Sequence, residues 1–183
     1  MRVIGGELRS RVLKSVPGLD TRPTPDRLRE ALFSILAPRI EEMVFADLYA
    51  GTGAVGIEAV SRGARRAIFA ESDHKAAEVI RDNLRSLGID GRCKLLEGKA
   101  TAILKSLQAD IVFFDPPYTL ERDYSTMLTI LGARPAGTIP QLVLAQHDKR
   151  LKLEETYGGL TKVRLLQQRD NCITFYAPTS TEP

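Results

Sequence analysis

The sequence is poor in the residues that bind metals and form disulfides. Only two histidines, His74 and His147, and two cysteines, Cys93 and Cys172, occur among its 183 residues. Two histidines are too few for a histidine-rich metal site, and we expect no metal site. The cysteines lack CxxC spacing, so we interpret both as packed or idle thiols in a reducing cytoplasm.

Long apolar runs are also missing. No stretch approaches the roughly 20 apolar residues of a membrane-spanning helix, and the opening residues MRVIGGE lack the apolar stretch of a signal peptide. Hydrophobic residues make up 43% and charged residues 27% of the chain, ordinary values for a globular protein. We expect a cytoplasmic protein with no membrane anchor, built as one domain with a small appendage, and monomeric by default.

The excess of positive charge is small and lies at one end. The net charge of +3 comes from 26 basic and 23 acidic residues. Residues 1–30 alone contain seven bases and four acids, so their excess equals that of the whole chain. A basic end on a near-neutral body is a weak indication of nucleic-acid binding, and a solvated charged surface is an equally good interpretation.

Strand-like and helical segments alternate from residue 44 onward. The strand-like runs are 44–49, 67–71, 94–97, 111–115 and 141–146, and a helical pattern over 74–87 lies among them. This alternation predicts an α/β fold with a doubly wound, mostly parallel sheet. Two later runs, 162–167 and 172–176, are joined by QRDN and predict an antiparallel hairpin closing one edge.

The chain before residue 23 is expected to form a basic β-hairpin extension, with strands at 1–4 and 11–16. Thr24 and Pro25 predict the start of a helix, with Thr24 as its N-cap and Pro25 in its first turn. The main domain is expected over 23–177, and a disordered tail over 178–183.

A glycine turn follows the first strand of the alternating region, in FADLYAGTGAVGIEA. Its glycines match GxGxxG, which alone is a weak signal shared with NAD enzymes. Asp47 stands four residues before Gly51, and a carboxylate there disfavours a pyrophosphate but suits a cation. S-adenosylmethionine is cationic and has no phosphate. Glu71 follows Gly51 by 20 residues, the spacing at which an acid accepts hydrogen bonds from a ribose.

A second motif, DPPY at residues 115–118, ends a later strand and is expected at the same sheet edge. The carboxylate of Asp115 and a carbonyl within the proline pair could accept hydrogen bonds from the exocyclic amine of a base. Tyr118 could stack on that base, and the stiff prolines would fix the geometry. A paired base must be flipped out to reach such a pocket. A Pro-Pro loop that merely ends a strand is the plainer alternative.

These motifs resemble those of S-adenosylmethionine-dependent amino-methyltransferases. With GLDTRPTPDRLREALFSIL, MRVIGGELRSRVL and GAVGIEAVSRGA, the chain resembles the bacterial 16S ribosomal RNA guanine-N2 methyltransferase family over about residues 1–177. The resemblance implies a seven-stranded, Rossmann-like sheet with an N-terminal hairpin. It also implies methyl transfer to the N2 amine of one guanine in a partly assembled small ribosomal subunit.

The resemblance also assigns candidate site residues. For the target guanine they are Asp115, Pro116, Pro117 and Tyr118. For S-adenosylmethionine they are Asp47, Tyr49, Ala50, Gly51, Thr52, Gly53, Glu71, Ser72 and Ala100. For the RNA they are Arg9, Arg11, Lys14, Arg22, Thr24 and Arg27. The chain departs from the family at Lys99, where Asp or Asn often lies beside the adenine, so a backbone contact at Ala100 is expected instead.

Several alternatives stay open at this point. Arg27 and Arg29 could contact phosphates or form ion pairs on a helix surface. His147 could touch the substrate, although a packed or solvated histidine is the commoner case. The chain could also be an adenine-N6 methyltransferase acting on DNA or RNA, an NAD-dependent oxidoreductase, or a non-catalytic RNA-binding assembly factor.

Overall fold

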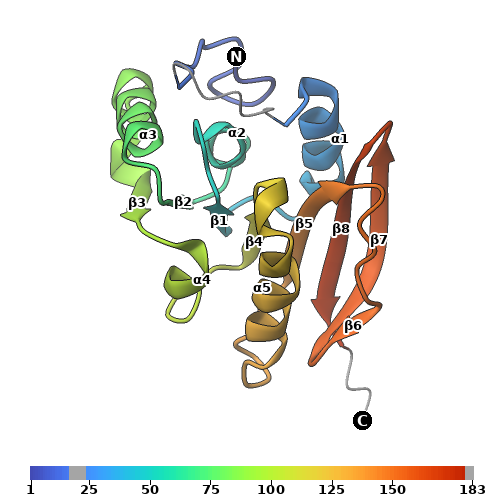
Figure 1. The fold of residues 1–183 in the computed structure, drawn as a ribbon. Coiled ribbons are helices and arrows are strands. Elements are labelled where there is room, and N and C mark those ends of the chain that lie inside the picture. Colours follow the sequence, from blue (N-terminus) through green and yellow to red (C-terminus); the bar gives the residue numbers. More distant parts are fainter. Residues whose placement is uncertain (17–23, 180–183) are drawn as a thin grey trace.

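An eight-stranded sheet forms the centre of the molecule (Figure 1). The structure, a computed structural model, describes residues 1–16 and 24–179. The strand order is β3-β2-β1-β4-β5-β8-β7-β6, with β1 to β5 parallel and β8 antiparallel to β5. The strands are β1 Val44–Leu48, β2 Arg66–Glu71, β3 Cys93–Glu97, β4 Ile111–Phe114, β5 Leu142–Asp148, β6 Thr156–Tyr157, β7 Leu160–Gln168 and β8 Asn171–Pro178.

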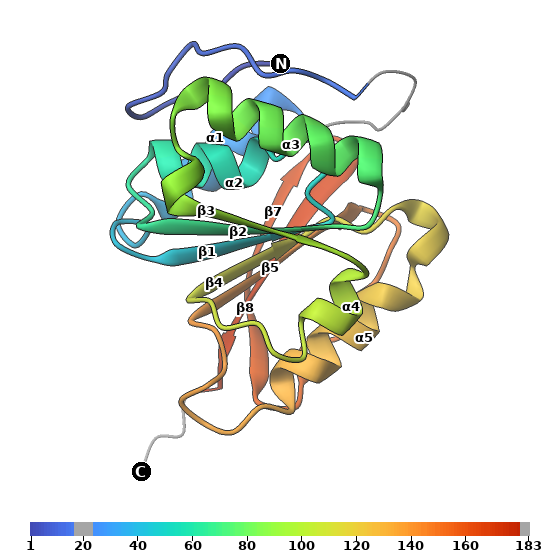
Figure 2. The same cartoon turned by 90° about the vertical axis from the view of Figure 1, so that its left-hand side faces the viewer.

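Helices cover both faces of this sheet, as the doubly wound prediction requires (Figure 2). Three of them, α1, α2 and α3, lie on one face, and α4 and α5 lie on the other. The helices are α1 Asp26–Leu36, α2 Ala54–Ser61, α3 His74–Leu87, α4 Ala100–Ile103 and α5 Arg122–Gly132, with short 3-10 turns η1 Asp90–Arg92 and η2 Tyr118–Leu120. In the described part of the chain, no helix has the length and apolarity needed to cross a membrane.

The central parallel strands are apolar because helices bury both of their faces. All four residues of β4 are buried, and so are six of the seven in β5. α3 shows how local signals set an element's limits. The Asp73 side chain accepts a hydrogen bond from the N–H of Ala76 at 2.8 Å, and Gly88 ends the helix in the left-handed conformation.

The sheet has one strand more than the expected seven. The additional strand, β6, is two residues long and pairs with the start of β7. Gly158 makes the turn between them with a positive φ of 57°. The expected hairpin at residues 162–167 and 172–176 is present as β7 and β8, each longer than its sequence pattern indicated.

The expected N-terminal strands at 1–4 and 11–16 are not regular strands, but the two segments do pair antiparallel. An isolated bridge joins Arg2 to Val12, and two backbone hydrogen bonds of 3.0 and 2.9 Å flank it. Beyond this short pairing, a side chain of α2 takes up the backbone donors of the first segment. Glu58 accepts hydrogen bonds from the N–H groups of Ile4 and Gly5, both at 2.8 Å.

The start of α1 also differs from the prediction. Pro25 occupies the N-cap position, and no side chain of the described residues caps the helix. Thr24 therefore lies one residue before the N-cap, and its hydroxyl donates a hydrogen bond to Gln146. Of the expected tail at 178–183, Pro178 ends β8, and residues 180–183 lie outside the described part of the chain.

Candidate active site

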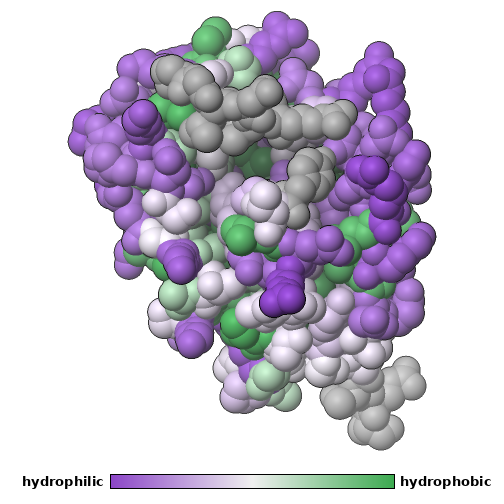
Figure 3. All heavy atoms as spheres, viewed as in Figure 1, coloured by the Kyte–Doolittle hydropathy of each residue, from purple (hydrophilic) through white to green (hydrophobic). Residues whose placement is uncertain are grey.

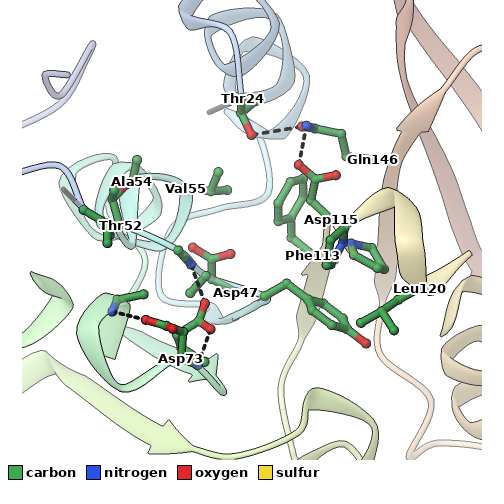
Figure 4. A pocket seen from close by; sticks show the side chains of 18 of the residues that line it. Thr24, Asp47, Thr52, Ala54, Val55, Asp73, Phe113, Asp115, Leu120 and Gln146 are labelled. Carbon is green, nitrogen blue, oxygen red and sulfur yellow. Dashed lines mark hydrogen bonds between the residues drawn. The ribbon is translucent and has the colours of Figure 1, made fainter. Parts of the chain in front are cut away.

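A cavity of about 490 Å³ opens where β1, β2, β4 and β5 end (Figure 4). Ligands of open α/β sheets bind at this carboxyl edge. Both predicted motifs contribute to the one cavity. The sequence-predicted residues that line it are Thr24, Asp47, Tyr49, Ala50, Gly51, Thr52, Glu71, Ser72, Asp115, Pro116 and Pro117.

The glycine turn leads from β1 into α2 through backbone conformations that few residues adopt. Tyr49 and Gly51 have positive φ values of 62° and 57°. The Tyr49 hydroxyl donates a hydrogen bond to the Asp123 carboxylate of α5, which ties the turn to the opposite face of the sheet. Tyr49 also lines the cavity.

Asp47, at the end of β1, is 2% exposed. One of its carboxylate oxygens accepts a hydrogen bond from the N–H of Gly56 in α2 at 2.8 Å. Burial raises the pKa of Asp47 to about 8; the Gly56 hydrogen bond lowers it, while the charges of Glu71 and Asp115 raise it further. A cation in the cavity would oppose this shift and favour the ionised form.

Glu71, at the end of β2, holds the neighbouring backbone in place. Its carboxylate accepts hydrogen bonds from the N–H groups of Gly51, Ser72 and Asp73, each at 2.8 Å. A carboxylate has about four acceptor sites. Three bonds leave about one site for a ligand hydroxyl, so this acid both shapes the turn and can accept from a ribose.

Asp115 directly follows β4 at the same edge of the sheet. Its Oδ2 atom accepts a 2.6 Å hydrogen bond from the side-chain amide of Gln146, and burial raises its pKa to about 7. The Pro117 carbonyl accepts from the N–H of Leu120 at 2.8 Å, whereas that of Pro116 receives no hydrogen bond from a described residue. Asp115 Oδ1 and the Pro116 carbonyl are therefore the two acceptors open to a ligand amine.

Some candidate residues lie elsewhere or are not described. Gly53 and Ala100 are buried and do not line the cavity, and neither does Lys99, which precedes α4. Tyr118 begins η2, but its side chain lies outside what the structure describes. Arg22 also lies outside the described residues.

The basic candidates that the structure describes do not line the cavity. Arg11 donates to the Ser86 carbonyl at 2.8 Å, and Lys14 pairs with Asp82 of α3 at 2.9 Å. Arg9 and Arg27 are exposed. Figure 3 shows hydrophilic residues gathered over the α3 side and over the upper ends of α1 and β7.

Arg29 cannot contact phosphates, because its side chain is fully buried. It pairs with Asp26 at 3.0 Å and lies 3.8 Å from Glu58. Of the two interpretations left open by the sequence, the ion pair is the one observed.

Two polar residues of β5 contribute to the cavity in ways that the sequence did not reveal. Gln146 bonds to Asp115 on one side and to Thr24 on the other, and it is 4% exposed. His147 is buried and is bonded to Thr174 and to the Asp148 carbonyl, both at 2.8 Å, while burial lowers its pKa. The available signal was a polar pair at the carboxyl end of an otherwise apolar strand, LVLAQHD.

The acidic lining suits a cationic ligand. Asp47, Glu71, Asp73, Asp115 and Asp148 all line the cavity. No positively charged side chain does so among the residues described. In the same part of the chain, no group of three or more His, Cys, Asp or Glu residues is arranged to hold a metal ion. The lining therefore fits the ammonium and sulfonium groups of S-adenosylmethionine better than a dinucleotide pyrophosphate.

Comparisons with known proteins agree with this geometry. The family model described as Conserved hypothetical protein 95 matches residues 1–177. Ribosomal RNA small subunit methyltransferase D of Haemophilus influenzae is 35% identical over 91% of this chain and 93% of its own. The solved structure of yhhF from Escherichia coli superposes with a TM-score of 0.84, at 29% identity, over 97% of each chain.

A more distant structure shares only the fold. It is an RNA methyltransferase from Salinibacter ruber in complex with S-adenosyl-L-homocysteine, at 17% identity and a TM-score of 0.65, covering 88% of this chain and 96% of the other. The family model matches nearly the whole chain, and the Haemophilus relative aligns almost from end to end. These two matches establish the family. The chain belongs to the family described as Conserved hypothetical protein 95, that of the ribosomal RNA small subunit methyltransferases D.

Proposed function

We propose that this protein transfers a methyl group from S-adenosylmethionine to the exocyclic N2 amine of a guanine in 16S ribosomal RNA. The observation that carries the proposal is the shared cavity, in which the acidic glycine turn and the Asp115-Pro116 acceptors face one space. The methyltransferase name of the Haemophilus relative and the S-adenosyl-L-homocysteine in the Salinibacter structure support it.

The cofactor half of the site comprises the ends of β1 and β2. Asp47 and Glu71 supply negative charge there, and the Gly51 backbone leaves open space where a side chain would begin. S-adenosylmethionine would supply an electrophilic methyl group on its sulfonium sulfur. The carboxylates of this chain would bind the cationic donor and orient it.

The substrate half comprises the end of β4. A guanine amine is a poor nucleophile because its lone pair is delocalised into the ring. Hydrogen bonds from its two N–H groups to Asp115 Oδ1 and the Pro116 carbonyl would fix the nitrogen in place. The proline ring keeps the second acceptor rigid, which favours the geometry of attack.

The RNA would cross the rim on both sides of the cavity. Lys14 and Arg27 lie near the lining residues Val16 and Thr24 in the sequence, and Arg9 and Arg11 continue the basic segment. The Lys14–Asp82 pair is exposed, so little stability would be lost on exchanging the acid for a phosphate. With so small a basic surface, we propose that a monomer acts on a small-subunit assembly particle.

Equilibrium binding tests the cofactor assignment. Titration calorimetry of the full chain should detect S-adenosylmethionine and S-adenosylhomocysteine, and no NADH, because the acidic lining repels a pyrophosphate. Tight NADH binding without S-adenosylmethionine binding would show that the chain is an oxidoreductase.

The Asp115→Ala variant tests the enzymatic role. It should lose methyl transfer to immature small subunits by at least about 100-fold while it still binds the cofactor and the RNA. Unchanged transfer would remove Asp115 from the mechanism. Wild-type chain that binds RNA but transfers no methyl group would instead be an assembly factor.

A further inference from the structure

Gln146 connects the start of α1 to the acid of the DPPY motif. Its Nε2 atom donates to Asp115 Oδ2 at 2.6 Å, and its Oε1 atom accepts from the Thr24 hydroxyl at 3.1 Å (Figure 4). These contacts join residues that are 122 positions apart in the sequence. Neither Thr24 nor Gln146 carries charge, so the series of hydrogen bonds acts through geometry.

The Asp115 carboxylate decides which way the Gln146 amide faces. With the NH2 group of Gln146 donating to Asp115, Oε1 faces Thr24, whose hydroxyl donates to it. An ionised carboxylate only accepts hydrogen bonds, so this is the amide orientation that it requires. The reversed amide would place two acceptors against each other.

The backbone of Gln146 is also fixed. Its carbonyl accepts a 2.6 Å hydrogen bond from the buried Tyr124 hydroxyl of α5, and β5 pairs with both β4 and β8. The amide therefore projects from a rigid strand. It occupies one oxygen of Asp115, while Oδ1 receives no hydrogen bond from any described residue.

We propose that Gln146 is a positioning residue for methyl transfer, held by Thr24 so that it fixes the Asp115 carboxylate for the target amine. The inference rests on the proposed function and assigns it a residue that the motifs do not contain. It also gives Thr24 a role in aligning the catalytic acid in place of the expected RNA contact.

The proposal has a consequence for pH dependence. A donor to the charged form of a carboxylate lowers its pKa, so loss of the Gln146 donor should make Asp115 harder to ionise. The other residues with titratable groups that line this cavity are Met1, through its amino terminus, and Asp47, Tyr49, Glu71, Asp73, His147 and Asp148. All of them are unchanged in the variants below. A shift of the acid limb, the low-pH side of the curve of methylation rate against pH, therefore reports the loss of the hydrogen bond.

Gln146→Leu and Thr24→Val remove the two hydrogen bonds at nearly constant volume. Gln141→Leu is the matched control, because Gln141 is exposed just before the opposite end of the same strand. Single-turnover methylation of immature small subunits should fall about 10- to 100-fold in Gln146→Leu and about 2- to 10-fold in Thr24→Val. The control should match wild type, and the Kd for S-adenosylmethionine should hold in all three.

The discriminating readouts are the acid limb and the double variant. In Gln146→Leu the midpoint of the acid limb should move to higher pH by about one unit. Thr24→Val should have no further effect in the Gln146→Leu background, because the two residues act in series. Gln146→Leu could have a melting temperature far below that of the wild type. In that case the acid limb of Thr24→Val, which we expect to move to higher pH as well, decides instead.

The inference would be overturned if Gln146→Leu kept the wild-type methylation rate and the wild-type acid limb. It would also be overturned if the two rate losses multiplied independently in the double variant. Loss of cofactor binding in a folded Gln146→Leu would also overturn it, because the residue would then act on the donor side. A wild-type chain with no transfer to RNA would reject the proposed function, and this inference with it. If the wild type is active and Gln146→Leu is equally active, the inference is rejected but the proposed function stands.

Discussion

At the scale of single residues, the third glycine of the turn shows that a residue can match a ligand-binding motif and yet serve helix packing. The sequence assigns Gly51, Gly53 and Gly56 to one ligand-binding turn. Gly56 instead lies against the buried ring of Phe69, where an added Cβ would come within 2.4 Å of the ring. It is required for close packing of α2 on β2.

Gly56→Ala should therefore destabilise the protein by about 1–3 kcal/mol, because the fully buried Phe69 ring has no space to move. Gly91→Ala is the control, since a Cβ at Gly91 meets nothing within 4 Å. Urea unfolding of both variants measures the difference. Equal stability of the two would show that α2 shifts to accept the methyl group.

A second expectation at this scale concerns the protonation of Asp115. Its pKa is raised to about 7 by burial, and only the carboxylate accepts a hydrogen bond on both oxygens. Single-turnover methylation should therefore fall as the pH drops below about 7. Bound S-adenosylmethionine is cationic and should move this fall in rate to lower pH. A rate that stays level from about pH 8 to about pH 5 would exclude an essential ionised acid with this pKa.

At the scale of elements, α2 anchors the N-terminal segment through a buried acid. Glu58 is fully buried and accepts from the N–H groups of Ile4 and Gly5 and from Arg62 at 2.7 Å. It also lies beside the buried Arg29, whose Nε and Nη1 atoms have no hydrogen-bond partner among the described residues. One negative charge thus both helps to anchor the segment and faces the buried Arg29.

Glu58→Gln should cost about 3–5 kcal/mol, because it leaves the Arg29 guanidinium buried without its main counter-charge. Glu78→Gln removes the exposed partner of Arg81 and should cost at most about 1 kcal/mol. Chemical unfolding compares the two variants. A small effect in Glu58→Gln would mean that Asp26 alone suffices to compensate Arg29.

The same scale shows how far the sequence predicts the structure. Periodicity predicted α3 with its observed limits, and the strand ends at Asp47, Glu71 and Asp115 brought both motifs to one edge. Local rules failed where distant side chains bind the same segments. Glu58 binds the N–H of Ile4, where the expected first strand ends, and Gln146 accepts from the hydroxyl of Thr24, the expected cap of α1. Such long-range hydrogen bonds leave no periodic signal.

At the scale of the whole molecule, burying acids at one end of the sheet makes stability depend on pH. The pKa of Asp47 is raised from 3.8 to about 8 by folding. Between those values the folded chain binds a proton that the unfolded chain does not. This contribution is fully present below the unfolded pKa and is lost as the pH rises through the folded one.

The melting temperature of the ligand-free protein should therefore decline from about pH 5 to about pH 9, and the decline should be smaller in Asp47→Asn. Asn keeps an acceptor for the Gly56 N–H but does not titrate. Asp90→Asn, at an exposed position, should follow wild type. Calorimetry across this range measures the slopes, and identical slopes for Asp47→Asn and wild type would contradict the assigned pKa.

The central claim is that the cationic donor and a guanine amine meet in one cavity. The direct measurement supplies the purified chain with tritium-labelled S-adenosylmethionine and immature small subunits, digests the RNA to nucleosides and identifies the labelled product by chromatography. We expect the label in N2-methylguanosine. Label in N6-methyladenosine, or RNA without label, would contradict the account.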